Sequence, residues 1–301
     1  MKKLILPILL IITVVSFNSC DKIDTPIPDG ILDTEISTDN LFWDDSSYVE
    51  SSSTVRKVLI EEFTGHTCTN CPQGAAQLES LISTYGNQIV PMGIHSDATF
   101  CDPRVLADGT PAQFINGVAA YTTDFRTSDG DAYRNTFGVN GIPKGFVSRV
   151  SNGTPFGFGQ WDSEFQIIQG DTPPLTIGIS TLYNDSARLV KTVVNTEWLT
   201  SSAGNYKLQV QFVEDSLVDW QLNSGVNDPD YLHRHVFRGS LNGTWGTDIP
   251  SANQGDIDTQ EFTYIIPANF KKKDCIVVVF VYKDNPDYEI VQVEELHVTS
   301  H

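Results

Sequence analysis

Two cysteines stand three positions apart, Cys68 and Cys71, and cysteines at this spacing have three common uses. They exchange disulfides with other proteins, form a static disulfide, or bind a metal. A structural zinc site normally takes four ligands, often from two paired motifs, whereas here one pair stands with His66 and His95 as the only added candidates. We therefore predict redox exchange first, a static disulfide second and no metal site. His66 has two alternative interpretations. If protonated, it would stabilise the Cys68 thiolate; if it lies in a solvent-exposed turn, it has no role in the chemistry.

The flanking segments predict a strand, a turn, a helix and a second strand. Residues 55–63 and 88–95 are short β-rich runs. Between them, apolar residues recur at helical spacing and end at Gly86: Ala75, Leu78, Leu81, Ile82 and Tyr85. The cysteines then lie at the N-terminus of this helix, where free backbone N–H groups and the helix dipole stabilise the thiolate of Cys68. Cys71, one turn further on, is placed to resolve a mixed disulfide formed by Cys68.

A later motif adds a resemblance. The run Phe-Gly-Val-Asn-Gly-Ile-Pro ends at Pro143 and is followed by another β-rich segment. With the strand, the C-x-x-C motif and the helix before it, this order resembles the thioredoxin fold. The resemblance implies a cis bond between Ile142 and Pro143 that faces the disulfide, with the backbone of Ile142 offered to an extended substrate. It also implies that Glu62 is the buried acid that exchanges a proton with Cys71. Glu61 points the opposite way by strand alternation.

The chain has 301 residues, which suggests two domains, and a Gly-Asp-Thr-Pro-Pro run at residues 170–174 marks a break. We predict an α/β thioredoxin-like domain over residues 55–170, with an insertion at about residues 96–126. An all-β, immunoglobulin-like sandwich domain of about seven strands follows over residues 171–301. The insertion either shapes access to the cysteines or is a decorative loop.

Two features of the β-rich half have alternative interpretations. Cys275 opens the run Cys-Ile-Val-Val-Val-Phe-Val-Tyr, which predicts a central strand buried on both faces. Cys275 either pairs with Cys101 of the insertion or packs as a small apolar residue. Residues 231–237 read as one strand, and its two histidines, His233 and His235, either bind a metal or ligand or lie on a half-exposed face.

The N-terminus predicts export and lipid attachment. Two lysines precede an uncharged, mostly apolar run that is too short for an ordinary membrane-spanning helix and is typical of a secretory signal. Cys20 follows this run and resembles the acylated cysteine of bacterial lipoproteins; the alternative is ordinary signal cleavage, with Cys20 lost or left as a free thiol. We predict a lipoprotein signal peptide over residues 1–19 and an acidic, lipid-anchored tether over residues 20–54.

The charge balance restricts the partners. The chain has 38 acidic and 19 basic side chains and a formal net charge of -19, which disfavours nucleic-acid binding. No cofactor is predicted. The predicted partners are an exported protein or peptide substrate, or a surface partner, together with the membrane through the lipid anchor.

Several segments together resemble the outer membrane protein twenty-eight family of bacterial lipoproteins over nearly the whole mature chain. They are the lipobox-like start, the acidic tether, the cysteine motif, Gly-Ile-Pro, and the segment from His-Arg-His-Val to Leu-Asn-Gly-Thr-Trp-Gly. The resemblance implies a thioredoxin-like domain, a β-domain and a lipid-anchored place at the outer membrane. Two functions stay open: a thiol-disulfide oxidoreductase, or a non-enzymatic surface-binding, adhesion or assembly lipoprotein whose disulfide is structural.

Overall fold

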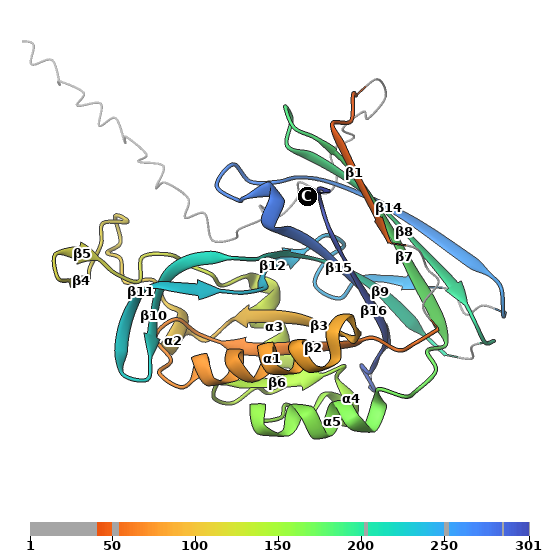
Figure 1. Ribbon diagram of the computed structural model, residues 1–301, viewed down its shortest axis with the longest axis horizontal. Helices are drawn as coiled ribbons and strands as arrows, with labels where there is room; N and C mark the ends of the chain where they lie inside the picture. The colour runs from red at the N-terminus through yellow and green to blue at the C-terminus, as the bar shows by residue number, and fades with distance from the viewer. Residues whose placement is uncertain (1–40, 50–53, 202–203, 250–252, 285, 301) are drawn as a thin grey trace, which may run out of the picture.

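The computed structural model describes residues 41–49, 54–201, 204–249, 253–284 and 286–300. They form two open sheets, two separate β-hairpins and a set of helices that flank the larger sheet (Figure 1). The predicted signal peptide, Cys20, and residues 21–40 and 50–53 of the predicted tether lie outside the described residues.

The larger sheet has eight strands in the order β16-β15-β9-β12-β3-β2-β6, with β13 paired beside β9. These strands are β2 (Val58–Thr64), β3 (Ile89–His95), β6 (Lys144–Val147), β9 (Tyr206–Glu214), β12 (Val236–Ser240), β13 (Thr247–Ile249), β15 (Cys275–Lys283) and β16 (Ile290–His297). Strands from both predicted domains belong to this one sheet. The junction is the parallel pair β12 and β3, where the Gly93 amide donates to the His235 carbonyl oxygen at 2.8 Å. Hydrogen-bonded structure therefore continues across the predicted boundary at residue 170.

The smaller sheet has the order β1-β7-β8-β14 and packs against the β9 and β15 end of the larger sheet. Its strands are β1 (Asp45–Val49), β7 (Leu175–Asn184), β8 (Leu189–Trp198) and β14 (Ile257–Ile265). β15 is central and buried on both faces, as its sequence predicts: Val277 and Val279 pack toward the smaller sheet, while Val278 and Phe280 pack on the other side.

Two sequence-based expectations change here. Residues 45–49 fall within the predicted tether, yet they form β1 and pair with β7; the Asp44 amide also donates to the Tyr183 carbonyl oxygen at 2.8 Å. The β-rich half contains ten strands in the described residues instead of about seven. Because one of its two packed sheets continues into β3, β2 and β6, it is not a self-contained sandwich.

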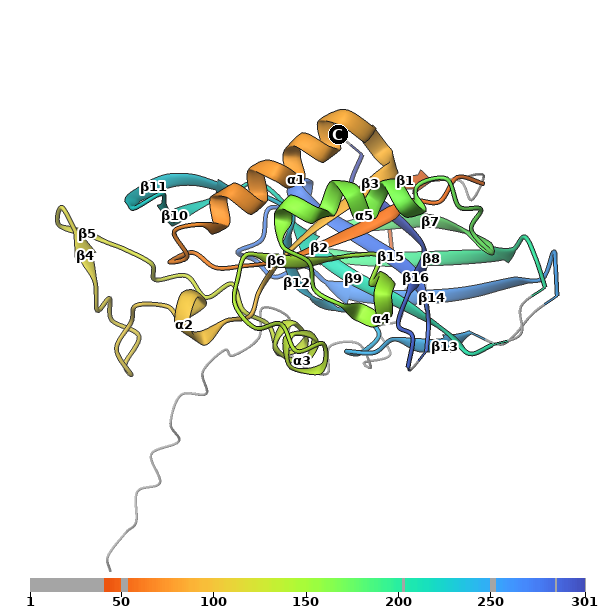
Figure 2. The same cartoon turned by 90° about the horizontal axis from the view of Figure 1, so that it is seen from below.

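The helices are α1 (Cys71–Tyr85), α2 (Ala98–Cys101), α3 (Ser128–Thr136), α4 (Val150–Gly153) and α5 (Trp161–Ile168). Helices α1 and α5 lie side by side over β2 and β6 (Figure 2), and the rings of Tyr85 and Phe165 are 4.3 Å apart. Apolar residues at three- and four-residue steps, such as Leu78 and Leu81, give α1 its buried face. Within the described residues, no helix has the length and apolar character needed to span a membrane.

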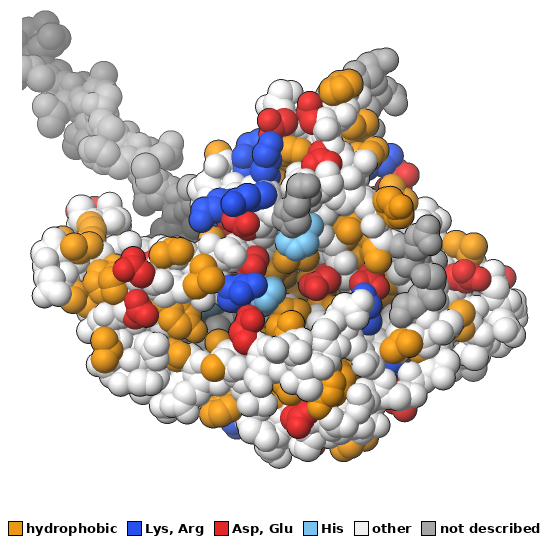
Figure 3. Space-filling model, in the orientation of Figure 1, with side chains coloured by type: hydrophobic (Ala, Val, Ile, Leu, Met, Phe, Trp, Pro, Cys, Tyr) orange, Lys and Arg blue, Asp and Glu red, His pale blue; other side chains and the backbone are white. Residues whose placement is uncertain are grey.

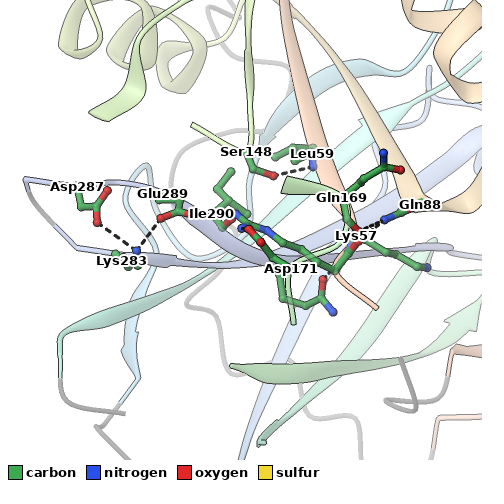
Figure 4. A network of polar contacts seen from close by, with 12 residues as sticks. Lys57, Leu59, Gln88, Ser148, Gln169, Asp171, Lys283, Asp287, Glu289 and Ile290 are labelled. Carbon is green, nitrogen blue, oxygen red and sulfur yellow. Dashed lines mark hydrogen bonds and ion pairs between the residues drawn. The ribbon is translucent and has the colours of Figure 1, made fainter. Parts of the chain in front are cut away.

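Polar contacts also tie the two halves together (Figure 4). Arg56 binds Asp171 at 2.9 Å and Glu289 at 2.8 Å, so one guanidinium joins the start of β2 to the end of α5 and to the segment before β16. The Leu59 amide donates to Ser148 Oγ at 3.2 Å. The segment that carries the cysteines is therefore held by residues from distant parts of the chain.

Candidate functional site

Cys68 and Cys71 form a disulfide at the start of α1, with their Cα atoms 5.4 Å apart. Cys71 is the first helical residue, and Pro72 follows it in the first turn. Backbone N–H groups in the first turn make no hydrogen bond within the helix, so the N–H that proline lacks is not needed there. Both cysteines are buried: Cys68 is 3% exposed and Cys71 is 1% exposed. Any exchange at this disulfide must therefore begin by uncovering Cys68.

The Ile142–Pro143 peptide bond lies just before β6 and is cis. Cys68 Sγ lies 4.0 Å from the Ile142 carbonyl oxygen, although 74 residues separate the two in sequence. Pro143 also lies close to the first turn of α1: a Cβ built on Gly74 would lie 3.1 Å from Pro143 Cβ. The fold thus places Ile142 and Pro143 against the cysteine pair.

Glu62 lies beneath the same turn of α1. It is 4% exposed, and no hydrogen-bond partner for its Oε1 is present among the described residues. A Cβ built on Gly74 would lie 2.6 Å from that oxygen, so a larger residue at position 74 would have to displace the carboxyl group. Burial raises the pKa of Glu62 to about 8. Near neutral pH the side chain is therefore a neutral acid that has a proton to give.

Glu61 points to the other face of the sheet, as strand alternation predicts. It accepts two hydrogen bonds from Arg149, at 2.8 and 2.6 Å, and both side chains are 1% exposed. The Arg149 guanidinium also lies over the rings of Phe137 and Phe280, 5.0 and 5.2 Å from their centroids. This ion pair joins β2 to the segment after β6, the guanidinium packs on β15 of the β-rich half, and Glu62 is left as the acid on the cysteine side.

The disulfide is covered by a hairpin that the sequence interpretation missed. It consists of β10 (Leu217–Asn223) and β11 (Val226–His233), which pair with each other in a sheet of their own. The Leu222 amide donates to the His66 carbonyl oxygen at 2.7 Å, and the Ser224 amide donates to the Thr69 carbonyl oxygen at 3.1 Å. The hairpin therefore binds the backbone on both sides of Cys68.

Gln221 makes the most direct contact between this hairpin and the cysteine loop. Its Nε2 donates to the carbonyl oxygens of Gly65 at 3.2 Å and Cys68 at 3.1 Å, and the side chain is buried. A sequence signal for the hairpin existed. Ser224 and Gly225 have positive φ, 51° and 86°, and a two-residue Ser-Gly turn between polar and apolar runs is typical of a hairpin.

The predicted insertion, residues 96–126, contacts the cysteine loop from the other side. It contains α2 and a small hairpin of β4 (Phe114–Ile115) and β5 (Val118–Ala119). The Thr67 amide and hydroxyl both donate to the Phe100 carbonyl oxygen at 3.0 Å. Tyr121 donates to Asn227 Oδ1 at 2.6 Å, which joins the insertion to the covering hairpin. Of the two interpretations, this placement favours a segment that shapes access to the cysteines.

Cys101 and Cys275 do not pair. Both are free thiols and both are fully buried, so the predicted alternative of small apolar packing applies. Cys101 Sγ donates to the Thr64 carbonyl oxygen at 3.2 Å, while Cys275 Sγ donates to the Lys271 carbonyl oxygen at 3.3 Å. Burial raises the pKa of Cys101 to about 12 and raises the pKa of Cys275 as well.

The histidines differ most from expectation. His66 is 1% exposed instead of lying in an open turn, and burial lowers its pKa, so it is neutral near pH 7.

The predicted strand 231–237 breaks between β11 and β12, where His235 has a φ of 51°. The rings of His66, His95 and His233 instead surround Phe125, at centroid distances of 6.3, 5.0 and 5.0 Å. Across the described ranges, no group of three or more His, Cys, Asp or Glu side chains is arranged to hold a metal ion.

Comparison with known proteins gives one family match. The family described as outer membrane protein Omp28 matches residues 130–301, a shorter span than predicted, which begins after the cysteine pair. No curated protein matches the chain.

Two solved structures superpose on this chain to different extents. HBP35 of Porphyromonas gingivalis superposes with a TM-score of 0.62 at 17% identity, over 82% of this chain and 76% of that chain. A protein of Agrobacterium tumefaciens has a TM-score of 0.46 at 14% identity, over 83% of this chain and 98% of that one. The first likeness supports a mixed fold of sheets and helices.

Proposed function

We propose that this chain, which belongs to the outer membrane protein Omp28 family, carries out thiol-disulfide exchange on exported proteins at Cys68 and Cys71. The family name points to the outer membrane. The observation that carries the proposal is the disulfide at the start of α1, where Cys68 Sγ approaches the Ile142 carbonyl oxygen and the neutral acid Glu62 lies under the same helical turn.

The arrangement around the cysteines supports a thioredoxin-like interpretation of this part of the chain. β2 and β3 are parallel, α1 connects them, and β6 pairs antiparallel to β2 on its other side. The Ile142–Pro143 segment enters β6 beside the disulfide. An extended substrate would use the backbone of Ile142 for β-type pairing, which positions a cysteine of that substrate next to Cys68.

The exchange reaction balances with the groups present. A substrate thiolate attacks Cys68 Sγ, the bond between the two cysteines breaks, and Cys71 leaves as a thiolate that takes the proton of Glu62. A second substrate thiolate then attacks the mixed disulfide and releases Cys68 as a thiolate. The substrate has lost two electrons and gained a disulfide, while the protein holds two reduced cysteines. In the reverse direction Cys68 attacks, Cys71 resolves, and Glu62 takes the proton from Cys71.

The test is capture of the mixed disulfide. We expect Cys71→Ser to accumulate a covalent adduct when it is mixed with a disulfide-bonded peptide: Cys68 attacks the peptide disulfide, one peptide sulfur leaves as a thiolate, and no second sulfur in the protein remains to release the other. Cys68→Ser should form no adduct, and Cys101→Ala is the matched control for removal of a buried thiol outside the pair. A Cys71→Ser protein that forms no adduct while it stays folded would overturn the proposal.

Lipid anchoring through Cys20 is part of the same proposal. It rests on the sequence of the first twenty residues, which lie outside the described part of the chain. Cys20→Ala should release the protein from membranes, whereas disruption of the preceding apolar run should block export. A Cys20→Ala protein that still fractionates with membranes would contradict the anchor.

The burial of both sulfurs favours a second candidate function, a binding or assembly protein whose disulfide is structural. Its surface would include the tips of the two hairpins, where Phe114 is 60% exposed and Val226 is 66% exposed. Phe114→Ser and Val226→Ser would then weaken attachment to a surface partner, and Cys68→Ser would not. If only Cys68→Ser has an effect, exchange is the function that remains.

A further inference from the structure

A cavity of about 480 Å³ lies between α1 and the β10–β11 hairpin, next to Cys71 of the disulfide. Cys71 and Ala75 of α1 form one wall, and Tyr231 and Leu232 of β11 form the opposite one. The floor is formed by β2 and β3 through Glu62, Gly93 and His95. In Figure 3, basic, acidic and histidine side chains gather at the centre of this face, between α1 and the strands above it. The volume lies within the range of small-molecule sites.

Buried polar atoms that have no protein partner lie at the floor of the cavity. His95 is 3% exposed, and neither of its ring nitrogens has a hydrogen-bond partner among the described residues. The same holds for Oε1 of Glu62. Buried polar atoms are normally paired, and exceptions commonly mark a place where another molecule supplies the partner. His95 lines the cavity but its ring nitrogens are covered, so a ligand there bonds with them once the ring turns toward it.

The electrostatics of the cavity favour an uncharged ligand. Burial lowers the pKa of His233 and of His235 to about 4, lowers that of His95 well below its usual value, and raises that of Glu62 to about 8. All four groups are therefore neutral near pH 7.

The charged groups of this region are partly exposed, and the one cation among the described residues that line it is already paired. Arg234 lies 3.9 Å from Glu79 and binds Asp215 at 2.8 Å, while the neutral ring of His235 lies 3.8 Å from Glu79. An anionic ligand would lose its water shell and find no cation of this lining free to bind it. The remaining walls are mostly apolar, through Ala75, Leu78 and Leu232.

From this geometry we propose that the cavity between α1 and the β10–β11 hairpin binds a small, uncharged molecule with an apolar ring body and one hydroxyl or carbonyl group. The ring body packs between Ala75 and Leu232, and the polar group hydrogen-bonds with the ring of His95. The cavity shares Cys71 and Glu62 with the proposed exchange site, but ligand binding is measured on the oxidised protein and needs no exchange, so either proposal can fail without the other.

The test is isothermal titration of the full oxidised chain with 1-naphthol, naphthalene and 1-naphthoate at pH 7. We expect saturable binding of 1-naphthol, on the order of tenfold weaker binding of naphthalene because one hydrogen bond is lost, and no binding of the anion. His95→Phe keeps the ring shape and should remove the preference for 1-naphthol over naphthalene.

A pair of variants on α1 gives the matched control. Ala75→Trp fills the cavity and should abolish binding of both neutral probes, whereas Ser83→Trp places the same side chain on an exposed part of the helix and should not. This pair decides the question even if His95→Phe does not fold. Equal affinity for 1-naphthol and naphthalene, unchanged binding by Ala75→Trp, or tight binding of 1-naphthoate would each overturn the proposal.

Discussion

Replacement of Glu62 by glutamine should change the pH dependence of stability in a defined direction. Burial raises the pKa of Glu62 from 4.5 to about 8 in the folded protein. Between these values the folded chain keeps the proton and the unfolded chain releases it, so the contribution to the free energy of unfolding is fully present below pH 4.5 and is lost as the pH rises through 8. Each pH unit is worth about 1.4 kcal/mol, which gives a loss of roughly 4 to 5 kcal/mol across the interval.

The assay is denaturant unfolding of the oxidised wild-type and Glu62→Gln proteins at several pH values from 5 to 9. Glutamine has nearly the shape of the neutral acid and does not titrate. We expect similar stabilities at pH 5 and a variant that is more stable by roughly 4 kcal/mol at pH 9. Glu261→Gln, at an exposed position on β14, is the matched control and should show no such divergence. Parallel stability profiles for wild type and Glu62→Gln would refute the inference that Glu62 is held as a neutral acid.

Three further predictions concern the surroundings of the cysteine pair. Arg149→Leu leaves the buried Glu61 carboxylate without its partner and should lower the free energy of unfolding by about 3 to 5 kcal/mol in denaturant melts; a loss below about 1 kcal/mol would contradict a buried ion pair. Gln221→Ala removes two hydrogen bonds to the cysteine loop and should speed reduction of the disulfide by dithiothreitol by on the order of tenfold, measured by thiol trapping, whereas an unchanged rate would mean that the hairpin does not limit access. Cys101 and Cys275 should react with iodoacetamide at pH 8 only after unfolding, and adducts on the native protein, seen by mass spectrometry, would show that they are accessible.

The parts of the fold that depend on local pattern could be predicted from the sequence. Spacing alone predicts three elements: the β-rich run before Cys68, the apolar stripe of α1, and the run of β15 that is apolar on both faces. For the same reason the cysteines were expected at the start of a helix.

The parts that depend on long-range pairing could not be predicted. β12 joins β3 at the register pair of Val236 with Gly93, and no local pattern marks either residue as a partner of the other. Residues 231–237 have the composition of one strand, yet the chain turns at His235 so that β11 stays with the covering hairpin while β12 enters the large sheet. The hairpin that contacts the cysteine loop depends on this turn, which is why the sequence predicts the cysteines at the start of a helix but does not predict the hairpin over them.

The most direct test of the proposed exchange reaction is the reduction potential of the Cys68–Cys71 pair, measured in glutathione buffers by thiol trapping and mass spectrometry. Exchange catalysts have potentials of about -270 mV or higher, and we predict a value in that range for the wild-type protein. Structural disulfides in exported proteins usually lie below about -300 mV. A reduction potential below about -300 mV for the Cys68–Cys71 pair would contradict the exchange function and favour the binding function.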